Sequence, residues 1–70
     1  MNMFKNLEAE MTRKNMSFEK MSELLGISYN SFRFKMKGIT EWKYSEMLKI
    51  QDVLSTTTKL SLEYLFEMNV

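Results

Sequence analysis

The sequence predicts an all-α protein, a compact domain of five short helices around a single core. Three observations favour this fold class. Hydrophobic side chains recur at three- and four-residue steps along most of the chain, which is the spacing of one face of an α-helix. Serine residues, which are preferred N-caps, precede several of these segments. Each of the two glycines stands where such a segment ends, as is typical of a helix C-terminus.

Two helices are predicted in the N-terminal part of the chain. The first has about three turns, and Asn15 ends it because asparagine tolerates the left-handed backbone conformation. Its hydrophobic stripe consists of Met3, Phe4, Leu7 and Met11. The second helix covers about 18–25, from an N-cap at Ser17 to a left-handed stop at Gly26. Its expected buried face consists of Met21, Leu24 and Leu25.

The third helix starts after an N-cap at Ser28 and ends near Lys37, where Gly38 follows. Phe32 and Met36 are four residues apart on this helix, so both are expected to face inward. The turn between the second and third helices is minimal, because the second helix stops just before Gly26 and Ser28 already caps the third.

This arrangement has the spacing of a helix-turn-helix, over about 17–38. Gly26 lets the chain turn sharply, Ile27 fills the angle between the two helices, and the small Ser22 allows their close approach. In such a motif the second of the two helices protrudes and can insert into the major groove of DNA.

The fourth helix is predicted over about 44–54, and a short fifth helix follows Ser61, its N-cap. The expected core face of the fourth helix consists of Met47, Ile50, Val53 and Leu54. Lys43 stands at the N-cap position of this helix and has no side-chain acceptor. Either Thr40 therefore caps the first turn, or its backbone N–H groups are left for another partner.

Length and composition exclude several classes of function. Seventy residues allow one domain, 1–70, and rarely enclose a ligand pocket beside the core. The chain has no cysteine and no histidine, which excludes thiolate nucleophiles, Cys/His zinc sites and Ser-His-Asp triads. We therefore expect a protein that is not an enzyme and that uses no metal, cofactor or small-molecule substrate.

No apolar run approaches the roughly 18 residues of a membrane span, and the absence of cysteine fits a reducing compartment. We therefore expect a cytoplasmic protein without a membrane partner.

The excess of positive charge is confined to one part of the chain, although the net charge of the whole chain is only +1. Residues 1–27 sum to zero and residues 44–70 sum to −2. Residues 28–43 sum to +3, because they carry Arg33, Lys35, Lys37 and Lys43 against Glu41. This segment contains the predicted third helix, where contacts with DNA phosphates would be needed.

A set of short motifs extends from about Leu7 to Phe66. They are Glu19, the run Glu23-Leu24-Leu25-Gly26-Ile27-Ser28, Ser31, Phe32, Gly38, Ser45-Glu46, Leu48-Lys49-Ile50 and the run Ser61-Leu62-Glu63-Tyr64-Leu65-Phe66. With these residues the chain resembles the XRE or Cro/cI-type helix-turn-helix regulators, most closely their small phage-encoded, Cro-like members. The resemblance implies a lambda-repressor-like fold and a repressor that reads a palindromic operator in double-stranded DNA with its third helix.

The predicted third helix supplies the candidate DNA-reading residues. Asparagine can bind adenine and arginine can bind guanine through two hydrogen bonds, and tyrosine can contact a thymine methyl group or a phosphate. The candidates for base readout are Ser28, Tyr29, Asn30, Arg33 and Phe34. The candidates for phosphate contact are Ser17, Ser31, Lys35, Lys37, Lys43 and Ser45. The simpler interpretation of the same residues is a solvated polar face with serine caps.

The C-terminal segment, about 55–70, is the candidate dimerisation segment. It carries more apolar surface than one short helix can bury on its own core. The candidate interface residues are Leu60, Leu62, Phe66 and Val70. A homodimer on DNA would double the few base pairs that one helix-turn-helix reads. The alternative is that these residues only seal the core.

Two departures from the family pattern favour a different class of function. Phe18 stands where many members have glutamine, and Phe34 stands on the outer face of the third helix, where a polar or basic residue is usual. Both phenylalanines are expected to point outward. Together with the modest net charge, they favour a protein-binding module on the same scaffold, such as a phage antirepressor or a host-defence inhibitor of the anti-CRISPR kind. Trp42 is interpreted as an aromatic residue that closes its loop against the core rather than as a stacking residue.

Overall fold

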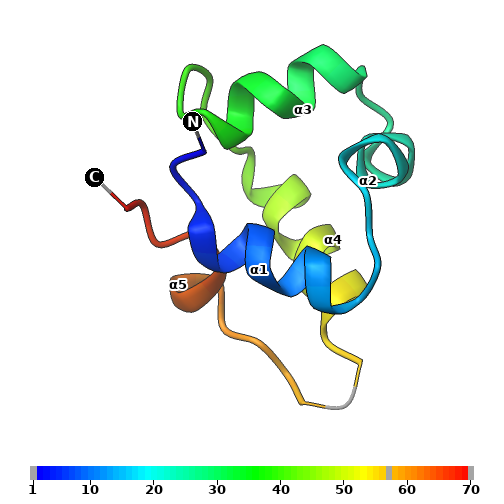
Figure 1. Ribbon diagram of the computed structural model, residues 1–70, viewed down its shortest axis with the longest axis vertical. Coiled ribbons are helices and arrows are strands. Elements are labelled where there is room, and N and C mark those ends of the chain that lie inside the picture. Colours follow the sequence, from blue (N-terminus) through cyan, green and yellow to red (C-terminus); the bar gives the residue numbers. More distant parts are fainter. Residues whose placement is uncertain (1, 57, 70) are drawn as a thin grey trace.

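The computed structural model describes residues 2–56 and 58–69, which form five helices and, within those ranges, no strand (Figure 1). The helices are α1 (Lys5–Arg13), α2 (Phe18–Leu25), α3 (Tyr29–Met36), α4 (Tyr44–Leu54) and α5 (Leu62–Leu65). The predicted all-α class is confirmed, and the bounds predicted for the second and fourth helices agree with α2 and α4. None of the helices in the described ranges is long and apolar enough to cross a bilayer.

The helix ends follow the local sequence. Three serine hydroxyls accept a hydrogen bond from a backbone N–H one turn later, as predicted. The pairs are Ser17 with Lys20 at 3.0 Å, Ser28 with Ser31 at 3.0 Å and Ser61 with Tyr64 at 3.1 Å. Left-handed residues follow three of the helices: Asn15 (φ 57°) after α1, Gly26 (φ 72°) after α2 and Gly38 (φ 79°) after α3. The sequence between helices thus fixes where each of these helices stops.

The core lies where all five helices meet. α2 packs against α3 and α4, while α5 packs against α1 and α4. The buried hydrophobic residues are Phe4, Leu7, Met11, Met21, Phe32, Met36, Ile50, Leu54 and Leu65. Three of them are methionines, whose flexible side chains fill irregular gaps between short helices.

Trp42 joins the loop before α4 to this core. Its ring lies edge-on to the rings of Phe4, Phe32 and Phe66, with centroid distances of 6.3, 5.4 and 5.5 Å. The interpretation of Trp42 as a core aromatic is therefore confirmed. Such edge-to-face pairs stabilise a fold beyond the area that they bury, by about 0.5–1.5 kcal/mol each.

The buried face of α2 differs from the predicted one by a rotation about the helix axis. It is formed by residues at positions i, i+3, i+4 and i+7, which are Phe18, Met21, Ser22 and Leu25. Leu24 lies at the margin of this face and is 43% exposed, so its expected burial is wrong. Phe18 is packed against Phe32, with ring centroids 5.1 Å apart, and does not point outward. On α4, Met47 is likewise only half-buried.

The C-terminal segment runs back beside the N-terminal one (Figure 1). The Asn69 N–H donates to the Met3 carbonyl at 2.7 Å, and Asn69 Oδ1 accepts from the Lys5 N–H at 3.1 Å. Leu60 and Phe66 pack against the core. Both are half-buried, so they help to seal the core of the protomer, and their assignment to a dimer interface stays a prediction. Val70 lies outside the described residues.

Candidate nucleic-acid interface

α2 and α3 are joined by the predicted turn, Gly26–Ser28. The Ile27 N–H donates to the Ser22 carbonyl at 3.0 Å, and the Ile27 side chain packs against the core. Ser22 is buried between the helices, and its hydroxyl donates to the Glu19 carbonyl at 2.7 Å. A Cβ atom added at Gly26 would meet nothing within 4 Å. The turn therefore requires glycine for its left-handed backbone and not for lack of space.

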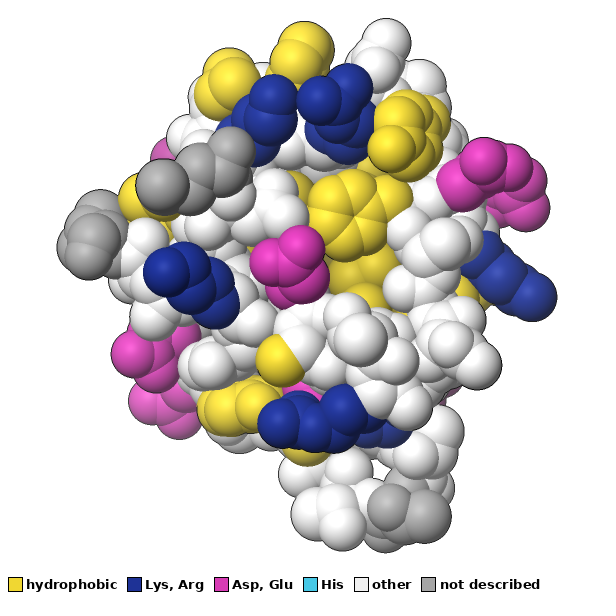
Figure 2. Space-filling model, in the orientation of Figure 1, with side chains coloured by type: hydrophobic (Ala, Val, Ile, Leu, Met, Phe, Trp, Pro, Cys, Tyr) yellow, Lys and Arg dark blue, Asp and Glu magenta, His cyan; other side chains and the backbone are white. Residues whose placement is uncertain are grey.

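The outer face of α3 carries all five candidates for base readout. Ser28, Tyr29, Asn30, Arg33 and Phe34 are exposed, and no acidic residue belongs to α3. Figure 2 shows dark blue basic and yellow hydrophobic side chains next to one another over α3, along the upper edge of the view. The prediction places these residues on one accessible face, and the structure brings them together there.

Lys35 does not belong to this face, which corrects its assignment as a phosphate contact. It is buried, and its Nζ lies 3.0 Å from Glu46 Oε1 of α4. The same ammonium donates to the Glu41 carbonyl at 3.0 Å and lies 5.9 Å from the centroid of the Trp42 ring. Lys35 thus ties α3 to the loop before α4 and to α4 itself, and its charge is already neutralised.

Glu46 is held by two donors of different origin. Its Oε1 accepts from the backbone N–H of Lys43 at 2.9 Å and from the Lys35 ammonium. Burial alone would raise the pKa of Glu46, but these two hydrogen bonds and the positive charges lower it overall. The carboxylate is therefore ionised at neutral pH and keeps Lys35 in place.

The other phosphate candidates differ in accessibility. Ser17, Lys43 and Ser45 are exposed, whereas Ser31 and Lys37 are half-buried. The Ser17 hydroxyl caps α2, and the Ser31 hydroxyl accepts from that of Ser28 at 2.9 Å. The structure thus gives both hydroxyls a capping or local role.

The N-terminus of α4 answers a question that the sequence left open. No side chain accepts a hydrogen bond from the first-turn N–H groups of α4, so Thr40 does not cap this helix. Instead, the side chain of Glu46, in the first turn of α4, accepts a hydrogen bond from the backbone N–H of Lys43, which precedes the helix. Next to this turn lie two exposed hydrophobic residues that sequence reasoning missed, Ile39 at 66% and Tyr44 at 67% exposure. The sequence could have indicated the exposure of Ile39, because Ile39 directly follows Gly38, where the left-handed backbone leads the chain out of α3.

A second buried carboxylate, Glu10, links α1 to α5. Its Oε1 accepts from Lys14 Nζ at 2.8 Å, and its Oε2 accepts from the Tyr64 hydroxyl at 2.8 Å. Arg13 also pairs with Oε2. The hydrogen bonds from Lys14 and Tyr64 lower the pKa of Glu10. These hydrogen bonds and ion pairs link α1 to α5, so the role of the cluster is structural.

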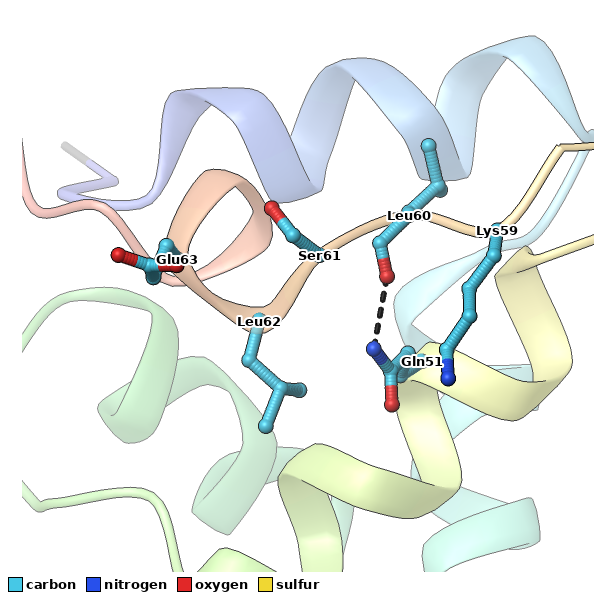
Figure 3. Close-up of a pocket in the computed structure, with 6 residues that line it drawn as sticks. All are labelled: Gln51, Lys59, Leu60, Ser61, Leu62 and Glu63. Carbon is cyan, nitrogen blue, oxygen red and sulfur yellow. Dashed lines mark hydrogen bonds between the residues drawn. The ribbon is translucent and has the colours of Figure 1, made fainter.

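An open depression of about 520 Å³ lies between α4 and the segment that leads into α5. It is lined by Gln51, Lys59, Leu60, Ser61, Leu62 and Glu63 (Figure 3). Gln51 Nε2 donates to the Leu60 carbonyl at 2.7 Å across it. Leu60 and Leu62, two half-buried residues of the predicted interface, both line this accessible depression. In residues 2–56 and 58–69, no group of three or more acidic residues is placed to hold a metal ion.

α3 and the segment that follows it offer two kinds of chemistry. Amide and guanidinium groups, from Asn30 and Arg33, can each form two hydrogen bonds with one partner. Ammonium groups, from Lys37 and Lys43, can neutralise single anionic charges.

In comparisons with known proteins, no family model, no curated protein and no solved structure matches this chain.

Proposed function

We propose that this chain is a sequence-specific regulator of transcription that binds double-stranded DNA, a repressor of the Cro-like kind. In this proposal α3 enters the major groove of an operator with two-fold symmetry. The observation that carries it is the outer face of α3, where the five candidate reading residues are exposed together and no acidic residue belongs to the helix. The function is binding, without catalysis, and it is exerted in the cytoplasm by occupying DNA that another protein would otherwise use.

The types of side chain on α3 support base recognition. Asn30 and Arg33 are the two residue types that bind adenine and guanine through paired hydrogen bonds in the major groove. Phe34 is 45% exposed and offers an apolar surface that suits a thymine methyl group. A carboxylate on this helix would repel the phosphates on both sides of the groove, and α3 has none.

A reading helix must be held in a fixed orientation, because a small displacement removes hydrogen bonds to base edges. Contacts with α2 and α4 help to hold α3 in place. Phe32, on its inner face, is fully buried and packs against Phe18 of α2. Lys35 binds Glu46 of α4. Because α2 and α4 hold its inner face, α3 presents its outer face as a rigid surface.

The basic residues near α3 support phosphate contact. Once Lys35 is paired with Glu46, the accessible cations of residues 28–43 are Arg33, Lys37 and Lys43. Cations that neutralise phosphates release counterions, which strengthens binding to any DNA sequence. Lys37 and Lys43 follow α3 in the chain and suit this role.

A homodimer belongs to the proposal, because one α3 reads too few base pairs to find a site in a genome. Leu62 at the depression between α4 and α5 is a residue of the predicted interface that suits a contact between two copies. Sedimentation of the chain with operator DNA tests this. We expect two protomers per duplex for the wild type and one for Leu62→Glu, with Glu67→Gln, which is exposed and does not line the depression, as a control that retains two. One wild-type protomer on a site without symmetry would contradict the dimer.

Selection from a random duplex library tests the function itself. The wild-type chain is expected to enrich one site with two-fold symmetry. The matched control is the Asn30→Ala/Arg33→Ala double variant, which alters two exposed residues and should fold normally while enriching no sequence. A wild-type chain that binds no duplex, even at low salt, would exclude the proposal.

One observation favours a second candidate, a protein-binding module on the same scaffold. Phe34, Ile39 and Tyr44 are 45%, 66% and 67% exposed, and exposed hydrophobic groups of this size suit a protein partner. Phe18 no longer contributes to this argument, because it is packed against Phe32. The two candidates differ in the selection experiment, since a protein-binding module would leave the duplex library unenriched.

A further inference from the structure

The guanidinium of Arg33 lies beside an aromatic ring on the surface of α3. Its central carbon lies over the ring of Tyr29, 5.8 Å from the ring centroid. The two residues are one helical turn apart, at positions i and i+4, and both are exposed. Among the described residues Arg33 forms no ion pair, so no carboxylate competes for its hydrogen-bond donors.

A guanidinium can bind a ring and a base at the same time, because the two contacts use different parts of the group. The attraction to an aromatic ring acts through the face of the planar guanidinium. The five N–H donors lie in its plane and point outward from its edge. A guanidinium over the Tyr29 ring therefore keeps the donors that bind guanine O6 and N7.

The Tyr29 ring is itself well placed to restrain a neighbour. Tyr29 is the first residue of α3, directly after the Ser28 N-cap, whose hydroxyl accepts from the Ser31 N–H. The backbone beneath the ring is therefore fixed. An arginine side chain has several rotatable bonds, and ordering them costs free energy when a base is bound.

We propose that Tyr29 is a positioning residue, which holds the Arg33 guanidinium ready to bind a guanine in the major groove of duplex DNA. This inference rests on the proposed function and assigns to Tyr29 an indirect role in place of its own base contact. Because the role needs only the ring, phenylalanine can replace tyrosine at this position and leucine cannot.

The first experiment uses the protein without DNA. In the nuclear magnetic resonance spectrum, the Cδ protons of Arg33 should be shifted upfield by the ring current of Tyr29. The shift should persist in Tyr29→Phe and disappear in Tyr29→Leu. Tyr44→Leu is the matched control, since it removes another exposed tyrosine, and it should leave the Arg33 signals unchanged. An Arg33 signal that is the same in Tyr29→Leu and wild type would overturn the proposal.

The second experiment measures dissociation constants for the duplex that the wild-type chain enriches from a random library, and for the same duplex with 7-deazaguanine at the guanine read by Arg33. The analogue lacks the N7 acceptor and should weaken wild-type binding about five-fold. Tyr29→Leu should weaken binding to the unmodified duplex about two- to five-fold and should lose most of its response to the analogue. Tyr29→Phe and Tyr44→Leu should both keep the wild-type response.

The outcomes separate this proposal from the function on which it rests. If no duplex is enriched, the DNA-binding function fails and the role of Tyr29 fails with it. If a duplex is enriched and Tyr29→Leu loses equal affinity for both duplexes, or none, Tyr29 does not act through Arg33 and only this inference is overturned. Circular dichroism of each variant confirms that the helices are intact.

Discussion

Lys35 and Lys37 are two residues apart at the end of α3, yet their surroundings differ. The Lys35 ammonium is enclosed by the Glu46 carboxylate, the Glu41 carbonyl and the Trp42 ring. Lys37 is half-buried and takes part in no ion pair among the described residues. A charge that is already neutralised by a buried partner contributes to stability, whereas an unpaired charge is available to an external anion.

Alanine substitution of these two lysines should therefore give opposite results. Lys35→Ala leaves the Glu46 carboxylate buried without its partner and should lower the free energy of unfolding by about 3 kcal/mol. Lys37→Ala should leave stability unchanged and weaken binding to all DNA sequences alike. Urea unfolding and DNA titration of both variants measure this. The double variant Lys35→Met/Glu46→Leu should recover part of the stability, because it removes both charges together but also removes the acceptor of the Lys43 N–H. Equal stability losses for the two single variants would contradict the assignment.

Acidification should destabilise the protein through Glu10 and Glu46. Both carboxyl groups have a pKa below the usual 4.5 in the folded chain, so the unfolded chain binds protons first as the pH falls. Their stabilising contribution is complete above pH 4.5 and is lost as the pH falls through the lower, folded values. Urea unfolding from neutral pH down to about pH 3 should show a weaker pH dependence for Glu46→Gln than for wild type. Exposed Glu67→Gln is the control and should retain the wild-type dependence.

At the scale of elements, the turn between α2 and α3 depends on one backbone conformation. Gly26 has φ 72°, and a Cβ atom would have open space around it. Any loss on substitution therefore measures backbone strain without steric overlap. The turn controls where α3 begins, and with it the face that α3 presents.

Two substitutions at Gly26 should rank by their tolerance of the left-handed region. Gly26→Val should lower the free energy of unfolding by about 2 kcal/mol, because a β-branched residue is strongly disfavoured there. Gly26→Asn should cost less than about 1 kcal/mol, because asparagine visits this region readily. Thermal unfolding of both variants measures the difference. Equal losses would show that the turn is limited by space and not by backbone conformation.

The polar residues of α3 should act separately from the lysines that follow it. Asn30→Ala and Arg33→Ala should each cost about 1–3 kcal/mol of binding free energy at one base position and should relax the preference there. Lys43→Ala should weaken every sequence by a similar factor. Selection from random duplex libraries, repeated with each variant, measures the preference. Sequence-independent losses from all three variants would mean that α3 does not read bases.

At the scale of the whole molecule, the charge distribution determines how binding responds to salt. The net charge is only +1, but Arg33, Lys37 and Lys43, which form no ion pair among the described residues, lie at and after α3. With about three to five phosphate contacts per protomer, the logarithm of the binding constant should fall against that of the salt concentration with a slope of about −3 to −4.5. Titrations at several salt concentrations measure the slope, and Lys43→Ala should reduce its magnitude by about 1. A slope near zero would contradict contact with the DNA backbone.

The features that the sequence predicts well are those determined within one turn of chain. Ser17, Ser28 and Ser61 are caps, and Gly26 is left-handed, because each depends on the three or four residues beside it. These features also set the bounds of α2 and α3, and so the accessible α3 face follows from them.

The features that sequence reasoning missed depend on partners elsewhere in the fold. Lys35 follows a basic pattern, and its pairing with Glu46 appears only when α4 packs beside α3. Phe18 stands at the exposed start of α2, but its ring packs against that of Phe32 in α3, on the other side of the turn. Glu10 is enclosed by Tyr64 of α5, from the other end of the chain. The spacing of residues along one helix does not report contacts with other helices, so these three contacts become visible only in the structure.

The position of Trp42 makes the protein its own optical reporter. The chain has one tryptophan, and its indole touches aromatic rings from α3, from the residue before α1 and from the residue after α5. Its Nε1 is buried without a hydrogen-bond partner among the described residues, so this edge of the native indole is shielded from water. Its fluorescence therefore follows the assembly of segments from both ends of the chain at once, and a red shift of the emission marks their separation without any added label.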